Sequence, residues 1–331
     1  MEHTSKITGR LAPSPTGRLH VGHARSFVIA WWSVRKAGGR MLLRFEDLDR
    51  SRVRPEYADG VLCDLEWLGL DWDGAPVSQF EGRQALHQAA QELCDRGLAY
   101  PCVCTRSEVQ AAIAAPHIGE VNEVYPGTCR DKFGSIEAAR AESGREPALR
   151  FRTPEGLVEF TDLLHGPQSQ AVAREVGDFP ITSRDGQVAY QLAVVVDDAR
   201  QGVTEVLRGD DLLDSTARQL ALQRALSLPS PRWGHLGLVV DGTGRRLAKR
   251  ADDLSLERLR EARVDPRQLI AWIADSAGLP PGDSRPPAAW IDDFRLPAEP
   301  EPTVRFDAPE LDSLLSGRVP ATSRSSRPEM F

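Results

Sequence analysis

The chain has 331 residues, of which 41% are hydrophobic and 27% charged, and its formal net charge is −7. This length and composition are ordinary for a globular protein of two domains, or of one domain with an insertion. The acidic balance excludes a protein that binds nucleic acid through overall positive charge, but a local basic face remains compatible with RNA. Without a signal-peptide core or a run long enough to span a membrane, the sequence favours a cytoplasmic enzyme with no membrane partner.

The first predicted unit is a strand followed by a helix. Residues 7–12 form a short buried strand, which Pro13 ends. His20 and His23 are expected three residues apart on the first turn of a helix that ends at the glycine pair 38–39. Unpaired N–H groups and the helix dipole attract phosphate to such an end, and the imidazoles add donors. The pattern predicts a phosphate site; two helix-start histidines without a ligand are the alternative.

A second strand is predicted over residues 41–45, and the acidic segment 46–49 comes directly after it. A strand, a helix and a strand in this order form a parallel unit, whose ligand lies beyond the carboxyl ends of the strands. Residues 10–14 should therefore face the acidic segment, although the acids alone also suit a solvated loop. Residues 56–70 and 82–98 have helical periodicity and are expected to be scaffold.

Three of the five cysteines lie close together in the chain, at Cys102, Cys104 and Cys129. An odd number of clustered thiols argues against a secreted disulfide scaffold and for reduced thiols or a metal. Zn²⁺ takes four ligands and thiolates suit it, so the cluster predicts a structural zinc knuckle. His117 and Tyr125 are both candidates for the fourth ligand, and three free thiols are the alternative.

The later elements are predicted from alternation, turn residues and helical periodicity. They are a helix over 107–114, antiparallel strands within 148–162, two strands around an Asp-Gly turn over 178–190, and a strand of the parallel sheet over 190–198. Beyond these come a strand over 203–211, a helix over 215–226, a strand from 238 that enters a basic glycine-rich loop ending at 250, and a helix over 265–278. The proline-rich residues 280–331 are expected to be largely disordered.

Several of these segments resemble, in chain order, the motifs of class I aminoacyl-tRNA synthetases of the glutamate branch. Residues 13–23, Pro-Ser-Pro-Thr-Gly-Arg-Leu-His-Val-Gly-His, resemble the HIGH signature, and residues 44–49, Arg-Phe-Glu-Asp-Leu-Asp, resemble the second block. The stretch from Tyr190 to Asp198 and the triplet Arg208-Gly-Asp resemble later blocks. Residues 246–250, Arg-Leu-Ala-Lys-Arg, resemble the KMSKS loop, with departures at Arg246 and Ala248 that bear on loop dynamics and rate more than on reaction type.

The resemblance implies a role for each matching residue. The implied catalytic residues are His20, His23 and Lys249, and the implied ATP-binding residues are His20, Gly22, His23 and Lys249. L-Glutamate is expected at Arg10, Leu11, Ala12, Pro13, Ser14, Glu46, Tyr190 and Arg208. The two guanidinium groups of Arg10 and Arg208 suit the two substrate carboxylates. Glu46 would bind the ammonium, and the Tyr190 hydroxyl would close the pocket. One structural Zn²⁺ is implied at Cys102, Cys104, Tyr125 and Cys129, with Tyr125 preferred over His117, and ATP with Mg²⁺ is a substrate.

The fold class that follows is α/β: a Rossmann-like parallel sheet with an inserted α+β zinc-bearing subdomain and a short helical C-terminal part. The expected division is 1–98 and 181–235 for the two halves of the nucleotide-binding domain, 99–180 for the insertion, 236–279 for the KMSKS-like loop and helix, and 280–331 for the tail.

The chain leaves no room after the KMSKS-like loop for the helical domain with which glutamyl-tRNA synthetases read an anticodon. It therefore closely resembles the glutamyl-queuosine tRNA(Asp) synthetase family over about residues 7–278. That resemblance implies a monomer that activates glutamate with ATP without tRNA and transfers it to queuosine in the anticodon loop of tRNA(Asp). A truncated glutamyl-tRNA synthetase, a coenzyme-forming nucleotidyltransferase and a non-catalytic synthetase-like binding protein are the alternatives.

Overall fold

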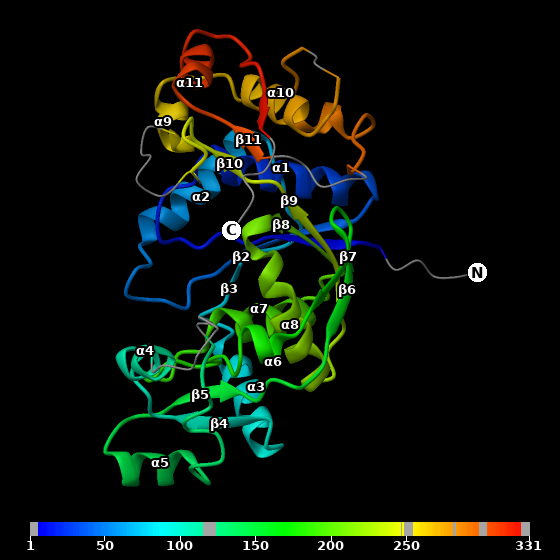
Figure 1. Cartoon of the computed structure of the whole chain (residues 1–331). Coiled ribbons are helices and arrows are strands. Elements are labelled where there is room, and N and C mark those ends of the chain that lie inside the picture. The colour runs from blue at the N-terminus through cyan, green and yellow to red at the C-terminus, as the bar shows by residue number, and fades with distance from the viewer. Residues whose placement is uncertain are drawn as a thin grey trace, which may run out of the picture.

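Two groups of strands lie edge to edge in the centre of the molecule (Figure 1). The structure, a computed structural model, describes residues 6–114, 124–245, 247, 254–280, 283–297 and 303–325. The first group consists of β1 (Thr8–Leu11), β2 (Arg40–Phe45) and β3 (Val77–Ser78), in that order. The second has the order β7-β6-β9-β8, formed by β6 (Val158–Asp162), β7 (Gly166–Gln170), β8 (Glu205–Gly209) and β9 (Arg232–Leu236).

The two groups continue each other through β1 and β8. The Thr204 amide, just before β8, donates to the Thr8 carbonyl at 2.8 Å. Within the groups the pairings are parallel except that of β6 with β7, which is antiparallel. The carboxyl ends of β1, β2 and β8 are therefore neighbours, as expected for a Rossmann-like sheet.

Helices cover both sides of the strands. On one side lie α1 (Val21–Lys36), α2 (Pro55–Leu68) and α10 (Pro266–Ser276), which share one hydrophobic cluster (Figure 1). On the other lie α3 (Arg83–Asp95), α7 (Tyr190–Arg200) and α8 (Leu213–Ala225), which share a second. The predicted α/β class is confirmed, because apolar faces from opposite sides bury the parallel strands between them.

The segment from Tyr190 to Asp198 was predicted as a strand, and this prediction is wrong: it forms α7. Its residues from Leu192 to Asp198 are all buried, and α7 packs against both α3 and α8. A helix buried on every side shows no polar face, so its short apolar run reads like an inner strand. The two strands predicted over 178–190 are reduced to single bridges, Arg150 with Pro180 and Thr182 with Val188.

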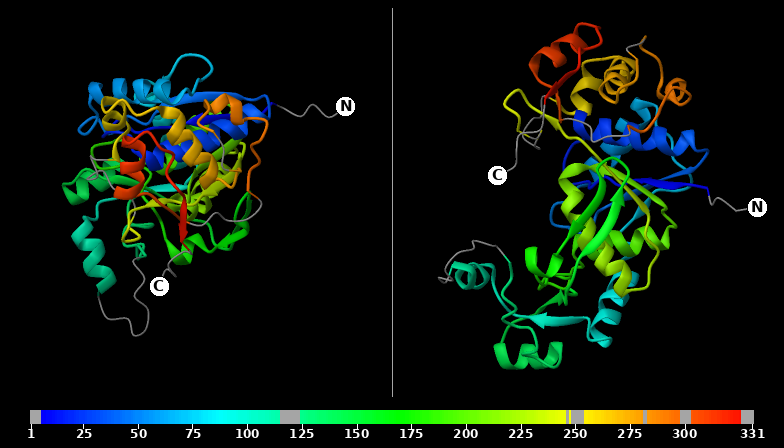
Figure 2. Two further views of the ribbon diagram at one scale, coloured as in Figure 1. Left: turned by 90° about the horizontal axis from the view of Figure 1, so that it is seen from above. Right: turned by 45° about the vertical axis from the view of Figure 1, so that its right-hand side comes forward.

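The segment inserted between the two halves of the nucleotide-binding domain lies at the end of the molecule opposite α10 (Figure 2). It contains the antiparallel pair β4 (Ala99–Cys102) and β5 (Ala148–Phe151), with α4 (Arg106–Ala114), α5 (Ile136–Ser143) and, nearer the body, α6 (Val172–Glu175). A separate small cluster of buried side chains, which includes Tyr100, Tyr125 and Phe133, forms its core. The exact boundaries assigned to the five segments of the chain stay a prediction.

Residues 280–331 were expected to be largely disordered, but their described parts pack on the body. They contribute η3 (Pro287–Trp290), β11 (Thr303–Arg305), α11 (Ala308–Leu315) and β12 (Ser323–Ser325). Before them the chain forms η1 (Asp210–Leu212), β10 (Val239–Val240), which pairs with β11, and α9 (Leu256–Glu261).

A few large aromatic side chains explain this packing. Trp290 and Phe294 lie against Trp32 of α1, with ring centroids 6.4 and 5.6 Å away. Phe306 meets Trp272 of α10 edge to face at 4.8 Å. Each such side chain buries a large apolar area, so a few anchors outweigh a proline-rich composition. None of the helices among the described residues is long and apolar enough to cross a membrane.

Candidate active site and metal centre

A cavity of about 620 Å³ opens at the carboxyl ends of β1, β2 and β8. Most of the predicted substrate and ATP residues line it: Arg10, Ala12, Pro13, Ser14, His20, Gly22, His23, Glu46, Tyr190 and Arg208. The expected approach of residues 10–14 to the acidic segment is confirmed, because the Glu46 amide donates to the Pro13 carbonyl at 2.9 Å.

One predicted site residue is absent from this lining, and another cannot be placed. Leu11 is fully buried and belongs to the hydrophobic cluster under α1, so its side chain has a packing role. Leu11 is the last residue of β1, and its side chain points to the opposite face from that of Arg10, away from the cavity. Lys249, with Arg246 and Ala248, lies outside the described residues.

The two histidines hold each other at the start of α1. His20 is the N-cap, with extended backbone angles, so it precedes the first turn on which it was predicted. Its Nδ1 accepts from the Gly22 amide at 3.1 Å, and the Nδ1 of His23 accepts from the His20 amide at 3.2 Å. A neutral imidazole whose Nδ1 accepts carries its proton on Nε2. Both rings, with centroids 3.8 Å apart, therefore present an Nε2 donor at a helix end that favours anions.

Arg10 and Arg44 share one buried carboxylate, that of Asp198 on α7. Arg44 Nη1 lies 2.7 Å from Asp198 Oδ1, whereas Arg10 Nε lies 3.5 Å from the same atom. Although burial alone would lower it, the carboxylates of Asp198 and Glu46 raise the pKa of Arg44. Arg10 Nε is buried without a hydrogen-bond partner among the described residues, so its charge is balanced only by this long contact with Asp198.

Glu46 brings a carboxylate to the cavity wall. Burial raises the pKa of Glu46, against the attraction of Arg44, Arg10 and Arg208. Arg44 Nη2 lies 3.7 Å from Glu46 Oε1, too long for a strong hydrogen bond. A carboxylate in this position gains from an additional cationic donor.

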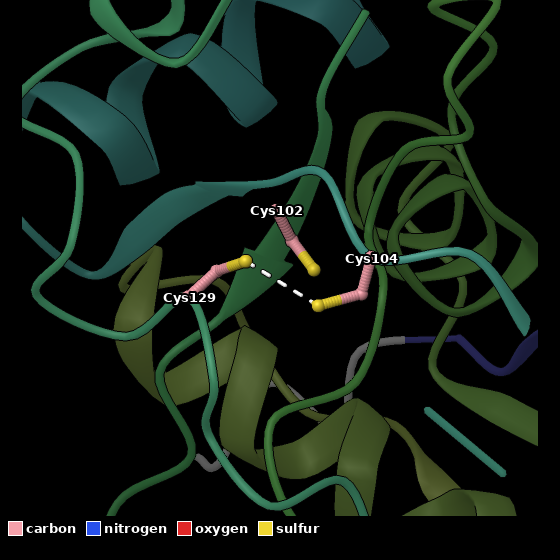
Figure 3. A group of neighbouring side chains, drawn as sticks. All are labelled: Cys102, Cys104 and Cys129. Carbon is pink, nitrogen blue, oxygen red and sulfur yellow. Dashed lines mark hydrogen bonds between the residues drawn. The ribbon is translucent and has the colours of Figure 1, made fainter. Parts of the chain in front are cut away.

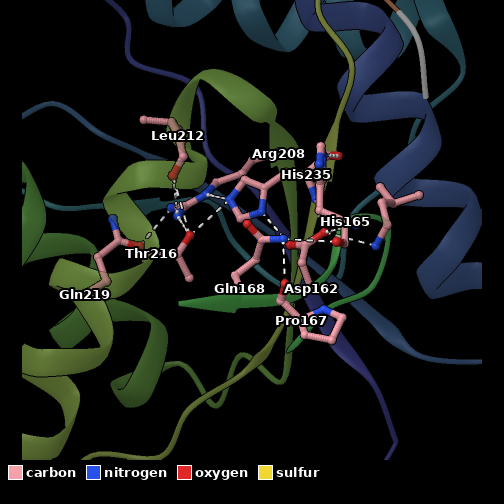
Figure 4. Close-up of polar contacts among 10 residues, drawn as sticks. Asp162, His165, Pro167, Gln168, Arg208, Leu212, Thr216, Gln219 and His235 are labelled. Atoms are coloured by element: carbon pink, nitrogen blue, oxygen red, sulfur yellow. Dashed lines mark hydrogen bonds and ion pairs between the residues drawn. The ribbon is translucent and has the colours of Figure 1, made fainter. Parts of the chain in front are cut away.

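Arg208, at the end of β8, carries a buried positive charge held by neutral groups. It donates to His235 Nε2 at 3.0 Å, to Gln219 Oε1 at 2.9 Å, to Thr216 Oγ1 at 2.9 Å and to the Leu212 carbonyl at 3.2 Å (Figure 4). Among the described residues, no carboxylate forms an ion pair with it. Burial lowers the pKa of Arg208, and an anion in the cavity would compensate this charge.

Tyr190 is the first residue of α7 and lines the same cavity as Glu46, Arg10 and Arg208. Burial raises the pKa of its hydroxyl, and the negative charge of Glu46 raises it further. The group is therefore a neutral phenol at physiological pH, able to donate one hydrogen bond to a bound carboxylate.

Three residues of this site had not been expected: His235 and Gln219, which contact Arg208, and Asp162, which contacts His235. His235 lies on β9 and Asp162 at the end of β6, so 73 positions separate two groups that are 2.6 Å apart. A single histidine in an apolar strand gave no local signal. The one signal that could have identified His235 was its place as a polar residue near the carboxyl end of a predicted parallel strand, because ligands bind at that edge.

The three predicted thiols also come together, in the insertion (Figure 3). The Sγ atoms of Cys102, Cys104 and Cys129 lie within 4.8 Å of one another, a group that can hold a metal ion. The Tyr125 hydroxyl lies 3.4 Å from Cys102 Sγ and 3.6 Å from Cys104 Sγ. His117, the other candidate, lies outside the described residues.

A cation supports one thiol of this cluster. Arg150 Nε donates to Cys102 Sγ at 3.3 Å, and its guanidinium stacks 3.8 Å above the Tyr125 ring. Although burial alone would raise it, the hydrogen bonds from Tyr125 and Arg150 lower the pKa of Cys102. Thiolates are the form that binds a metal, so the environment favours metal binding at Cys102.

Comparison with known proteins assigns the chain to a class. Residues 6–285 match the family described as tRNA synthetases class I (E and Q), catalytic domain. A glutamate tRNA ligase from Elizabethkingia meningosepticum, solved in complex with its amino acid, superposes with a TM-score of 0.78 at 22% identity, covering 94% of this chain and 69% of that one. The chain is thus a class I synthetase, an ATP-binding ligase of the aminoacyl-tRNA synthetase type.

Sequence relatives narrow the family. A glutamyl-Q tRNA(Asp) synthetase of Symbiobacterium thermophilum is 43% identical over 324 residues, which cover 94% of this chain and 99% of the relative. Its counterpart in Deinococcus radiodurans is 48% identical over 280 residues, covering 83% and 90%. The chain belongs to the glutamyl-Q tRNA(Asp) synthetase family, which confirms the resemblance drawn from the motifs.

Proposed function

We propose that the chain activates L-glutamate with ATP to glutamyl-adenylate, without tRNA, and transfers the glutamate to the queuosine base at the wobble position of tRNA(Asp). The observation that carries the proposal is one cavity that brings Arg10, Glu46, Tyr190 and Arg208 together with the two histidines at the start of α1. The names of the relatives support the acceptor.

Glutamate at neutral pH has two carboxylates and one ammonium, and the cavity offers a partner for each. Arg208 has no carboxylate partner in the described chain, and Arg10 is only loosely paired, so each can take one substrate carboxylate. Glu46 takes the ammonium, and the Tyr190 phenol donates to a carboxylate oxygen. Ala12, Pro13 and Ser14 form the wall along the end of β1.

The phosphates of ATP lie at the start of α1 in this proposal. His20 and His23 donate to these phosphates from Nε2. Gly22 leaves space for the His20 ring, since a Cβ at this position would lie 3.0 Å from that ring. Lys249 is proposed as a further partner of the phosphates. Ser255, six residues after it in the chain, pairs with His20 in a β-bridge.

The reaction has two steps. A glutamate carboxylate oxygen attacks the α-phosphorus, a P–O bond to the leaving pyrophosphate breaks, and the histidine donors stabilise the charge that develops on the phosphates. Mg²⁺ bound with ATP neutralises part of that charge. A hydroxyl of the queuosine cyclopentenediol then attacks the acyl carbonyl, the mixed anhydride bond breaks, and AMP leaves. No covalent enzyme intermediate is needed.

The cysteine cluster is proposed as a structural Zn²⁺ site with Cys102, Cys104, Tyr125 and Cys129 as ligands. In a tetrahedral site with Zn–S and Zn–O bonds of usual length, a sulfur and an oxygen ligand lie about 3.5 Å apart. The Tyr125 hydroxyl is 3.4 and 3.6 Å from two of the sulfurs, which matches this separation. Metal analysis of Tyr125→Phe and His117→Ala tests the fourth ligand, and only the former is expected to bind zinc more weakly.

Pyrophosphate exchange across the amino acids tests the first step. We expect exchange with glutamate in the absence of tRNA and none with glutamine, whose neutral side chain leaves a buried guanidinium unpaired. Comparable exchange with glutamine would contradict the pocket assignment. The absence of exchange with every amino acid would favour a non-catalytic binding protein.

Labelled glutamate with a queuosine-containing tRNA(Asp) anticodon hairpin that lacks a CCA end tests the second step. Labelling of this hairpin, and not of unmodified tRNA(Asp) or tRNA(Glu), is the expected result. Labelling that requires a CCA end would instead identify a glutamyl-tRNA synthetase without an anticodon domain. Because an acidic protein must use local Arg and Lys contacts, hairpin binding should weaken as salt rises.

A further inference from the structure

A buried chain of three side chains runs from β6 through β9 to the cavity (Figure 4). Asp162 Oδ2 lies 2.6 Å from His235 Nδ1, and Arg208 Nε donates to His235 Nε2 at 3.0 Å. The side chains of Asp162 and His235 are both completely buried. The proposed mechanism uses only the last member of this chain, so the other two need an explanation.

The protonation state of His235 follows from its neighbours. Arg208 Nε has a proton to donate and no lone pair, so the His235 Nε2 opposite it must accept and cannot carry a proton. Thr216 Oγ1, 3.2 Å from the same nitrogen, accepts from Arg208 and can donate to Nε2 in the same way. The ring is therefore neutral, with its proton on Nδ1, from which it donates to Asp162.

The surroundings of Asp162 hold it as the anion that this arrangement needs. Its Oδ1 accepts from the amides of Leu164 and His165, both at 3.0 Å. Although burial alone would raise it, the hydrogen bonds from His235 and from these amides lower the pKa of Asp162. Burial lowers the pKa of His235, so the imidazole stays neutral beside the guanidinium.

We propose that Asp162 and His235 are positioning residues that fix the Arg208 guanidinium for the substrate carboxylate, by selecting the Nδ1–H tautomer of His235. The inference rests on the proposed role of Arg208 in binding glutamate. With the other tautomer, Nε2–H would face Arg208 Nε–H, two donors without an acceptor, and the guanidinium would have to turn away.

The tautomer itself can be measured without substrate. In side-chain ¹⁵N NMR of the whole protein at neutral pH, assigned by loss of the signal in His235→Gln, His235 should show a protonated Nδ1 and an unprotonated Nε2. A proton on Nε2, or on both nitrogens, overturns the inference whether or not the chain activates glutamate. This readout separates the failure of the inference from failure of the proposed function.

Two substitutions of His235 separate positioning from packing. Asn places an amide where Nδ1 was and keeps the contact with Asp162, but has no atom that reaches Arg208. Gln places its amide oxygen where Nε2 was and keeps an acceptor for Arg208. Loss of one hydrogen bond to a charged group predicts that His235→Asn raises KM for glutamate by on the order of 10- to 100-fold, with KM for ATP within about twofold.

In the pyrophosphate-exchange assay, KM for glutamate in His235→Gln should stay close to that of the parent protein. Asp162→Asn removes the anion that selects the tautomer, so its KM for glutamate should rise as in His235→Asn. Thermal unfolding of every variant is recorded in parallel. An equal rise of KM for glutamate in His235→Asn and His235→Gln, or no rise in either, overturns the positioning role and leaves a structural one.

Discussion

The cavity and the cysteine cluster differ in what holds their polar groups in place. Around the cavity the chain supplies the partners: Arg208 has four neutral acceptors and Arg44 a buried carboxylate. In the insertion, three sulfurs and a phenol face one another, with Cys104 and Cys129 Sγ atoms 3.4 Å apart. The first site is organised by the fold itself, whereas the second has a donor set that a cation would complete. Damage to one should therefore affect chemistry, and damage to the other stability.

Arg208→Gln should have the largest effect on activity. Breaking a buried charge pair typically costs 3–5 kcal/mol, so kcat/KM for glutamate in pyrophosphate exchange should fall by roughly 10³-fold. The control is Arg96→Gln, which removes a half-exposed guanidinium on the surface next to α3 and should leave exchange unchanged. Near-normal exchange in Arg208→Gln would mean that the cavity binds its substrate through other groups.

His23→Ala should have the next largest effect on activity, through a lower kcat. Removal of one preorganised donor that acts mainly in the transition state lowers kcat by on the order of 10²- to 10³-fold, with KM for glutamate little changed. His87→Ala, at an exposed position of α3, is the matched control. A variant with normal turnover and a raised KM would show that His23 only binds ground-state phosphate.

The double substitution Cys102→Ala, Cys104→Ala tests the opposite side of the comparison. Zinc content, measured on protein purified without chelator, should fall from one ion per chain to none, with a clear loss of thermal stability of the insertion. Glutamate exchange should stay within a few-fold of the parent, because the cluster lies in a separate small core. Cys63→Ala, at an exposed cysteine, should change neither quantity. Loss of exchange equal to that of Arg208→Gln would show that the two regions depend on each other.

The sequence predicted the parts of both regions in which function and local pattern coincide. His20, His23 and Glu46 follow predicted strands and turns, and the three cysteines stand close in the chain, so their neighbourhood could be anticipated. The partners of Arg208 could not, because they come from three elements, η1, α8 and β9, and His235 meets Arg208 only through the pairing of β8 with β9. The same reason explains the wrong strand at 190–198, where burial on every side removed the periodicity.

The smallest effect is expected on stability alone, where α2 packs against α9 in the half of the molecule that carries the cavity. Asp64 Oδ1 lies 3.4 Å from Arg260 Nε, and burial raises the pKa of Asp64 to about 6, although Arg260 opposes the shift. Above pH 6 the folded state holds a buried carboxylate that the unfolded chain would solvate, so the group destabilises the fold. As pH falls from 6 toward the ordinary value of 3.8, only the folded state takes up the proton, and stability from this group rises.

Urea unfolding at several values of pH can isolate this contribution. Relative to Asp64→Asn, the parent protein should gain up to about 3 kcal/mol between neutral pH and pH 4, since each unit of pKa shift corresponds to about 1.4 kcal/mol. Asp59→Asn, at an exposed position of the same helix, should run parallel to the parent. Parallel curves for Asp64→Asn and the parent would contradict the raised pKa. The cysteine cluster takes no part in the contact of Asp64 with Arg260. Removal of zinc should therefore lower the free energy of unfolding without changing its dependence on pH, so the two regions can be separated by pH as well as by mutation.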